Sequence, residues 1–294
     1  MRFEGVFVAT VTPFDLSGHV DFSALSKHLD WLSGFPIAGF VPCGTTGEAS
    51  TLTETERDRI LAITITVAQA RKLKVIAGCG SNSTRVAEEL IVKAKEAGCD
   101  AALVVAPYYN RPSSSGIEAH YSALADANQF PLILYNVPAR TGVNLTSNMV
   151  SRLLRHSNII GIKEASGNHT QWLDLSTAID WREKSLLSGD DDAFATLMGL
   201  GACGIISATA NVIPEEFVNL YHAGNSGDFR QAFRIQKEIA PLIRAAFIES
   251  NPGPIKLMLN RMGRMSEKLR LPLVSPTDIS VQAIEKVLRD SKIL

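Results

Sequence analysis

Eight short apolar segments, roughly 28 residues apart, constrain the fold of this chain more than any other feature. Most contain aliphatic or β-branched residues without polar alternation, which is typical of strands buried on both faces of a parallel sheet. The segments are residues 6–11, 39–42, 74–77, 101–106, 131–135, 159–162, 185–187 and 204–206.

Helical patterns fill the gaps between these segments. Asp21 precedes the first pattern, and the capping box formed by Thr53 and Glu56 opens a second that runs through Ala70. A third pattern ends before Gly98, and further helices are expected at 117–127, 147–156, 170–179, 193–200 and 214–223. The alternation predicts an α/β fold, a TIM (β/α)8 barrel.

A doubly wound nucleotide-binding sheet is the alternative, and its fingerprint is poor here. Gly78 and Gly80 are not followed by the third glycine, and no Gly-Lys-Ser/Thr phosphate loop occurs. Beyond residue 225 only helices are expected, at 228–249, 255–262 and 281–290. We therefore predict a catalytic barrel in residues 1–225 and a C-terminal helical region in residues 226–294.

The charge balance argues against a nucleic-acid partner. Lys and Arg number 29 and Asp and Glu 30, a net charge of -1, whereas polyanion-binding chains normally carry a basic excess. No apolar run approaches the ~20 residues that span a bilayer, and the N-terminal segment lacks the apolar core of a signal peptide. We expect a cytoplasmic protein without a membrane partner.

No metal site is expected, because the cysteines match no zinc spacing and the six histidines are scattered. The histidines are expected at the surface or its boundary, and the four cysteines as reduced, partly buried thiols. A Gly-x-Ser-x-Gly nucleophile elbow is absent, and no cysteine is placed with a histidine as in a thiol hydrolase.

One lysine, Lys163, ends a strand that is predicted to be buried. Barrel active sites lie at the carboxyl ends of the strands. Burial disfavours the ammonium form of a lysine and frees the amine as a nucleophile, as imine formation with a ketone requires. The plainer interpretation is an ion pair with a carboxylate such as Glu164.

Other strand ends would meet Lys163 at the barrel mouth. Thr45 and Thr46 lie in a glycine-flanked turn whose N–H and hydroxyl groups suit an anion, although an ordinary turn is the alternative. Tyr135 suits proton transfer, with a core aromatic residue as the alternative. Arg140 suits binding of a carboxylate, with a surface ion pair as the alternative. Together these residues favour Schiff-base chemistry on a small keto acid.

Six ordered motifs resemble those of the dihydrodipicolinate synthase (4-hydroxy-tetrahydrodipicolinate synthase) family. They are GTTGE at 44–48, PYYNRP at 107–112, YNVPARTG at 135–142, GIKEASGN at 161–168, LSGDD at 187–191 and GIISATAN at 204–211, and NPGPIK follows at 251–256. The resemblance implies a homotetrameric class I aldolase-type lyase with a TIM barrel and no metal or organic cofactor. It also implies condensation of pyruvate with L-aspartate 4-semialdehyde in lysine (diaminopimelate) biosynthesis.

The resemblance further implies catalytic roles. Lys163 would form the imine with pyruvate, and Tyr135 would transfer protons during imine and enamine formation. Thr45 would link Tyr135 to Tyr109, which a neighbouring subunit would supply. On residue type alone, Tyr108 and Tyr109 are expected to be packing residues at a proline-framed turn.

Substrate binding follows from the same resemblance. Thr46 and the main chain at Ile206 would hold the pyruvate carboxylate, and Arg140 would meet the carboxylate of the semialdehyde. Sialic acid lyases of the same superfamily usually have an apolar residue where Arg140 stands. The alternatives are another class I pyruvate-dependent aldolase, such as N-acetylneuraminate lyase or 2-keto-3-deoxygluconate aldolase, and a non-catalytic sugar-acid-binding regulator.

The positions that bind lysine in inhibited family members depart from the usual pattern. Val86 removes a carboxylate expected to receive the lysine amine, and Arg57 adds a like charge. Only Asn82 and Tyr108 keep the usual residue. The six matching positions are Ala49, Glu54, Arg57, Asn82, Val86 and Tyr108. We predict weak or absent inhibition by lysine.

Overall fold

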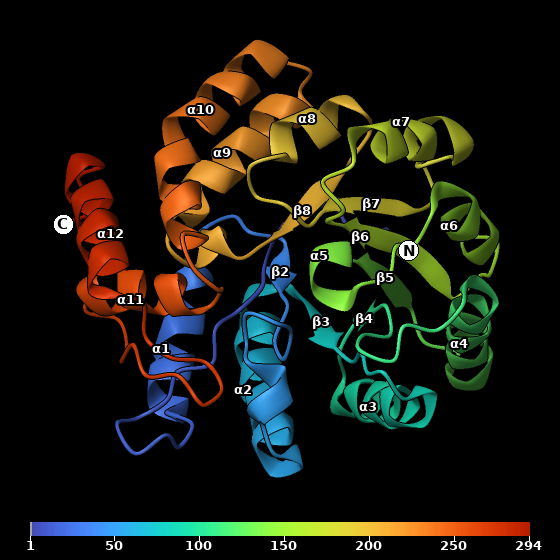
Figure 1. Cartoon of the computed structure of the whole chain (residues 1–294), viewed down its shortest axis with the longest axis horizontal. Coiled ribbons are helices and arrows are strands. Elements are labelled where there is room, and N and C mark those ends of the chain that lie inside the picture. Colours follow the sequence, from blue (N-terminus) through green and yellow to red (C-terminus); the bar gives the residue numbers. More distant parts are fainter. Residues whose placement is uncertain (1) are drawn as a thin grey trace.

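The computed structural model describes residues 2–294 and contains a closed barrel of parallel strands (Figure 1). The strands are β1 (Gly5–Val8), β2 (Gly39–Phe40), β3 (Lys74–Gly78), β4 (Ala101–Val105), β5 (Leu132–Asn136), β6 (Ile159–Glu164), β7 (Ser185–Ser188) and β8 (Gly204–Ser207). Each strand pairs with the next, and β8 closes on β1. The predicted (β/α)8 barrel is therefore confirmed.

Helices follow the strands around the barrel. They are α1 (Phe22–Leu32), α2 (Glu54–Arg71), α3 (Thr84–Ala97), α4 (Ser114–Asn128), α6 (Ser147–Leu153), α7 (His169–Ala178), α8 (Phe194–Gly199) and α9 (Pro214–Asn225). Three short helices that the sequence patterns did not predict lie at strand ends: η1 (Ala49–Thr51), α5 (Pro138–Thr141) and η2 (Thr209–Asn211). In Figure 1, α5 lies inside the ring of outer helices.

The predicted helix ends are confirmed at three places. The Asp21 side chain accepts from the Ala24 N–H at the start of α1, and Thr53 and Glu56 form a reciprocal capping box at the start of α2. Gly98 ends α3 with a φ of 94°, a left-handed conformation that glycine adopts without steric cost.

Two strands are shorter than predicted. β1 ends at Val8 and β2 at Phe40, although their apolar runs continue for several residues. The continuing segments form the rim of the barrel, where the Thr10 N–H donates to Val41 O and the Thr12 hydroxyl donates to Gly47 O. An apolar run therefore marks burial here rather than the length of the strand.

Two apolar clusters separate the layers of the fold. One fills the barrel interior and includes Phe7, Ile133 and Ile206, and the other lies between the strands and the outer helices. All four cysteines are free and buried, as expected. The expectation for the histidines is wrong at His28 and His120, which are buried because their helices α1 and α4 turn these positions inward.

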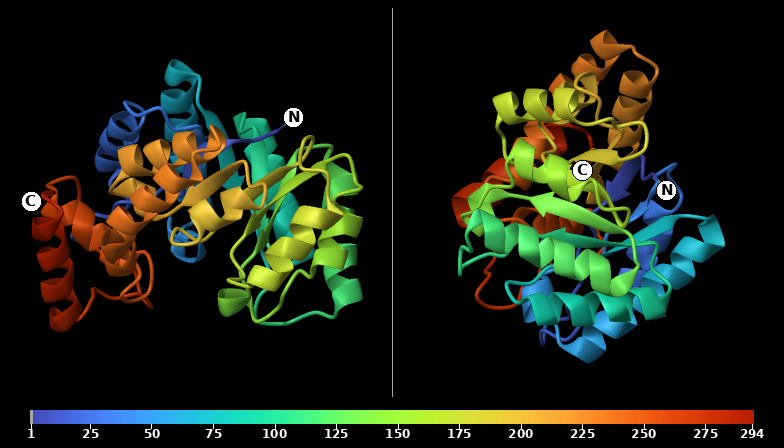
Figure 2. Two further views of the ribbon diagram at one scale, coloured as in Figure 1. Left: turned by 90° about the horizontal axis from the view of Figure 1, so that it is seen from above. Right: turned by 90° about the vertical axis from the view of Figure 1, so that its right-hand side faces the viewer.

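Three helices follow the barrel, namely α10 (Phe229–Ala246), α11 (Gly253–Arg261) and α12 (Asp278–Asp290). Helix α10 packs on α9 and α12. In Figure 1 and the left view of Figure 2, α11 and α12 lie at the end of the molecule opposite α4. Within residues 2–294, no helix has the length and apolar character needed to cross a membrane.

Candidate active site

Lys163 and Tyr135 lie side by side at the carboxyl ends of β6 and β5. The two residues are paired in the strand register, and the Lys163 Nζ lies 4.3 Å from the centroid of the Tyr135 ring. They are 7% and 8% exposed. Leu187, the register partner of Lys163 on β7, belongs with Tyr135 to the interior cluster, so the lysine faces the inside of the barrel mouth.

Glu164 is wholly buried and its carboxylate bonds to groups other than Lys163, so the Glu164 ion pair of the plainer interpretation does not form. Successive side chains of a strand point to opposite faces, which directs Glu164 toward the outer layer. Its carboxylate accepts from the Ser166 N–H at 2.7 Å, from Asn136 Nδ2 at 3.0 Å and from Gln171 Nε2 at 3.3 Å. Glu164 thus fixes the ends of β5 and β6 relative to each other.

The opposite flank of Lys163 is formed by the end of β7. A Cβ added at Gly189 would lie 3.0 Å from the Cε and Cγ of Lys163, so only a glycine leaves this lysine room. Burial raises the pKa of Asp190 to about 6, and the neighbouring carboxylates of Asp192 and Asp191 act in the same direction, while the charge of Lys163 opposes them. The Asp190 carboxyl group therefore loses its proton at a higher pH than an ordinary aspartate does.

The β2 loop, residues 41–53 between β2 and α2, brings Thr45 and Thr46 to the same rim. Thr46 is buried, and its hydroxyl accepts from Asn251 Nδ2 at 2.9 Å, whereas Thr45 is exposed. A Cβ at Gly47 would lie 3.1 Å from Thr10 O, which explains the glycine after the two threonines. The turn is held by specific contacts rather than being a free glycine loop.

The remaining candidates occupy different surroundings. Ile206 lies on β8 in the interior cluster, next to the mouth. Arg140 is exposed on α5 and makes no ion pair within residues 2–294, so it is not the surface ion-pair residue of the alternative. Tyr109 is 89% exposed with a φ of 71°, and Tyr108 is also exposed, so neither tyrosine packs in the core of this chain.

Sequence reasoning missed several residues of this rim. Glu48 forms a buried ion pair with Lys256, and Asn251 donates to the Thr46 hydroxyl. All three residues lie in the GTTGE and NPGPIK motifs, but sequence reasoning gave them no role. A lysine between Ile255 and Leu257 in an apolar stretch was the available signal, because a buried lysine needs a partner.

A closed barrel whose strand ends gather a buried lysine, a tyrosine and a hydroxyl-rich turn defines a (β/α)8-barrel enzyme with its site at the carboxyl rim. The model of the dihydrodipicolinate synthetase family matches residues 2–291. The chain belongs to the dihydrodipicolinate synthetase family.

Curated relatives and solved structures cover the chain from end to end. A 4-hydroxy-tetrahydrodipicolinate synthase of Thermodesulfovibrio yellowstonii is 43% identical over 292 residues, which are 99% of each chain. The dihydrodipicolinate synthase of Acinetobacter baumannii, solved with pyruvate, superposes with a TM-score of 0.96 at 41% identity and covers 99% of this chain and 100% of its own. The enzyme of Cyanidioschyzon merolae, solved with lysine bound, has a TM-score of 0.96 at 35% identity and 99% coverage of both chains.

Proposed function

We propose that the chain is a lyase that condenses pyruvate with L-aspartate 4-semialdehyde, the 4-hydroxy-tetrahydrodipicolinate synthase reaction of lysine (diaminopimelate) biosynthesis. The observation that carries the proposal is the buried Lys163 facing the barrel mouth over Tyr135. The full-length similarity to named synthases supports the same reaction.

Lys163 acts as the nucleophile. Its free amine attacks the keto carbon of pyruvate, and loss of water gives a protonated imine. The Lys163 side chain is almost fully withdrawn from water, so little solvent competes with pyruvate for its amine. The imine draws electrons from the adjacent methyl group, so loss of a proton from that carbon gives an enamine.

Carbon–carbon bond formation follows from the enamine. Its methylene carbon attacks the aldehyde carbon of the semialdehyde, and the resulting alkoxide takes a proton. Tyr135 lies beside Lys163, and Thr45 would connect it to Tyr109 of the partner subunit, which gives a hydroxyl relay without a charged acid. The amine of the semialdehyde then displaces Lys163 from the imine carbon and closes a six-membered ring.

Carboxylate recognition is local in this proposal. Thr46 and the main chain at Ile206 hold the pyruvate carboxylate, and Arg140 meets the carboxylate of the semialdehyde. With a net charge of -1, the chain has no overall excess of positive charge to attract two anions. The free guanidinium of Arg140 on α5 suits bidentate contact with a carboxylate.

The organisation of the protein is part of the proposal. We infer a homotetramer in the cytoplasm that needs no metal or organic cofactor, with residues 1–225 as the catalytic barrel and 226–294 as a helical region. The exposure of Tyr109 supports the assembly, because an aromatic side chain that is 89% exposed in one chain is available for burial against a second copy.

A coupled assay tests the proposal by comparing pyruvate plus the semialdehyde with sialic acid and 2-keto-3-deoxygluconate as substrates. We expect turnover of the semialdehyde only. Arg140→Met should lower kcat/KM for the semialdehyde about 10- to 100-fold, because a charge-assisted contact contributes about 1.5–3 kcal/mol. Arg182→Met, which removes an exposed guanidinium paired with Asp180, is the matched control and should leave activity unchanged. Cleavage of either sugar acid with no turnover of the semialdehyde would contradict the proposal.

A further inference from the structure

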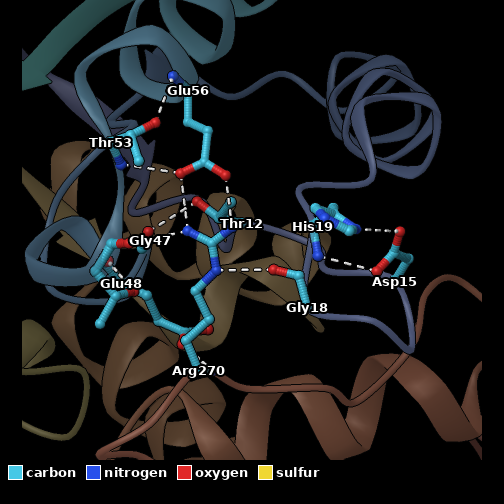
Figure 3. Close-up of polar contacts among 10 residues, drawn as sticks. Thr12, Asp15, Gly18, His19, Gly47, Glu48, Thr53, Glu56 and Arg270 are labelled. Carbon is cyan, nitrogen blue, oxygen red and sulfur yellow. Dashed lines mark hydrogen bonds and ion pairs between the residues drawn. The ribbon is translucent and has the colours of Figure 1, made fainter.

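The β2 loop is joined to the C-terminal region by a set of polar contacts that the proposed chemistry does not use. They connect residues 44–56 with residues 251–270, more than two hundred positions away along the chain. Figure 3 shows the part of this set around Arg270 and Glu48. Because the loop carries Thr45 and Thr46, these contacts act directly behind the candidate site.

Lys256 lies on α11 and is completely buried. Its Nζ donates to Glu48 Oε1 at 2.5 Å and to Lys268 O at 2.7 Å, and it lies 4.1 Å from the centroid of the Phe14 ring. Burial lowers the pKa of Lys256 to about 8, while the Glu48 carboxylate opposes the shift. The ammonium form therefore still predominates at neutral pH and completes a buried ion pair.

Glu48 is the residue that the ion pair holds in the loop. It has a φ of 52° and a ψ of 37°, a left-handed conformation that is uncommon outside glycine and persists where surrounding contacts maintain it. Its second carboxylate oxygen accepts from the Arg270 backbone N–H at 3.1 Å. Both oxygens of Glu48 are thus bound to the C-terminal region.

The side chain of Arg270 extends this connection to α2. Its guanidinium makes a bidentate contact with Glu56, at 2.8 and 2.5 Å, and also donates to Gly18 O and Thr51 O. Glu56 is at the same time the capping-box acid of Thr53, as Figure 3 shows. Arg270 is therefore bound to Glu48, Thr51 and Glu56 of the 44–56 segment.

We propose that Glu48 and Lys256 are positioning residues, which hold the Thr45–Thr46 turn in the geometry that receives the pyruvate carboxylate. This inference rests on the proposed function for the identity of the ligand. The ion pair fixes the residue two positions after Thr46, and Asn251, from the same NPGPIK segment, donates to the Thr46 hydroxyl itself at 2.9 Å. The C-terminal helical region thus contributes to the binding site of the barrel.

Two variants separate positioning from simple stability. Lys256→Met alone leaves the Glu48 carboxylate buried without a partner and can prevent folding. The double variant Glu48→Gln/Lys256→Met removes both charges together and is the one on which the test depends. Asn251→Ala removes only the donor to Thr46, and Arg289→Met is the matched control, because it breaks the Arg289–Glu285 pair within α12 without touching the β2 loop or the residues bound to it.

The first measurement is amide hydrogen exchange of residues 44–48 in the free protein. We expect at least tenfold faster exchange in the double variant and wild-type exchange in Arg289→Met. The second measurement is the pyruvate concentration that gives half-maximal covalent labelling with borohydride. We expect it to rise more than threefold in the double variant and in Asn251→Ala, with the KM for the semialdehyde unchanged.

The exchange rates and the pyruvate dependence together decide whether the ion pair positions the loop. Exchange in segment 44–48 at the wild-type rate, or half-maximal labelling within threefold of wild type in the double variant, overturns the inference. A general loss of thermal stability with an unchanged pyruvate dependence also overturns it, since a merely structural pair would behave in that way. If the wild-type protein is not labelled by pyruvate at all, the proposed function fails instead, and the exchange rates still decide whether the ion pair holds the loop.

Discussion

Replacing Gly189 by alanine should disable Lys163 while leaving the lysine itself in the sequence. The added Cβ would lie 2.8 Å from the Cβ of Ala165 and 3.0 Å from the Cε and Cγ of Lys163. Nonbonded carbons attract best at about 3.5–4.0 Å, so the lysine side chain must move by roughly 0.5–1 Å. A displacement of this size at a reacting group costs on the order of 100-fold in rate.

The cost to stability should be much smaller than the cost to activity. Overpacking of one methyl group destabilises a protein by about 1–3 kcal/mol, which lowers the unfolding midpoint of a chain of this length by about 2–6 °C. Thermal unfolding together with kcat and KM for pyruvate measures both effects. Gly199→Ala is the control, because its Cβ would meet only Phe229 at 3.8 Å, an ordinary contact. A Gly189→Ala variant with more than half of the wild-type kcat/KM would refute the packing argument around Lys163.

Three further expectations concern titration, thiol access and regulation. The Arg270 contact lowers the pKa of Glu56 from 4.5 to about 2, so the stability that this contact contributes is complete above pH 4.5 and is lost as the pH falls toward 2. The difference in unfolding midpoint between wild type and Glu56→Gln should therefore shrink as the pH falls from 4.5 to 2, and a constant difference would contradict this expectation. Burial raises the pKa of Cys43 to about 11 and that of Cys99 to about 12, so a thiol reagent at pH 8 should modify fewer than one cysteine in the native protein and all four after denaturation. Sub-millimolar lysine should not inhibit strongly. The Arg57 guanidinium, which donates to Gly78 O at 2.6 Å, lines the same cavity of about 330 Å³ as Val86, so the cavity has a like charge and lacks one carboxylate for the lysine amine. Strong inhibition in an initial-rate assay would show this expectation to be wrong.

The barrel was predictable because its evidence is local. Apolar runs without alternation mark doubly buried strands, and the capping box at Thr53 and the glycine at Gly98 mark helix ends. The same patterns overestimated the length of β2, because residues 41–42 remain buried after the strand has ended at Phe40. Burial is therefore encoded in the run, whereas the end of hydrogen bonding depends on how neighbouring strands are staggered.

The candidate site was predictable in part, since strand ends of a parallel barrel meet at one rim. Lys163 and Tyr135 follow from this rule and lie together. The Lys256–Glu48 pair does not follow from it, because its partners are separated by 208 positions and their pairing depends on where α11 packs. Local pattern shows only that a lysine is buried, and not which carboxylate it meets.

The central claim is that Lys163 forms an imine with pyruvate. Borohydride reduction of the protein with pyruvate, followed by peptide mass analysis, tests it directly, with Lys163→Ala and a reaction without pyruvate as controls. The account predicts that the peptide containing Lys163 alone gains the mass of reduced pyruvate, and that the controls gain none. An unmodified Lys163 peptide, or modification at Lys256 instead, would contradict the account.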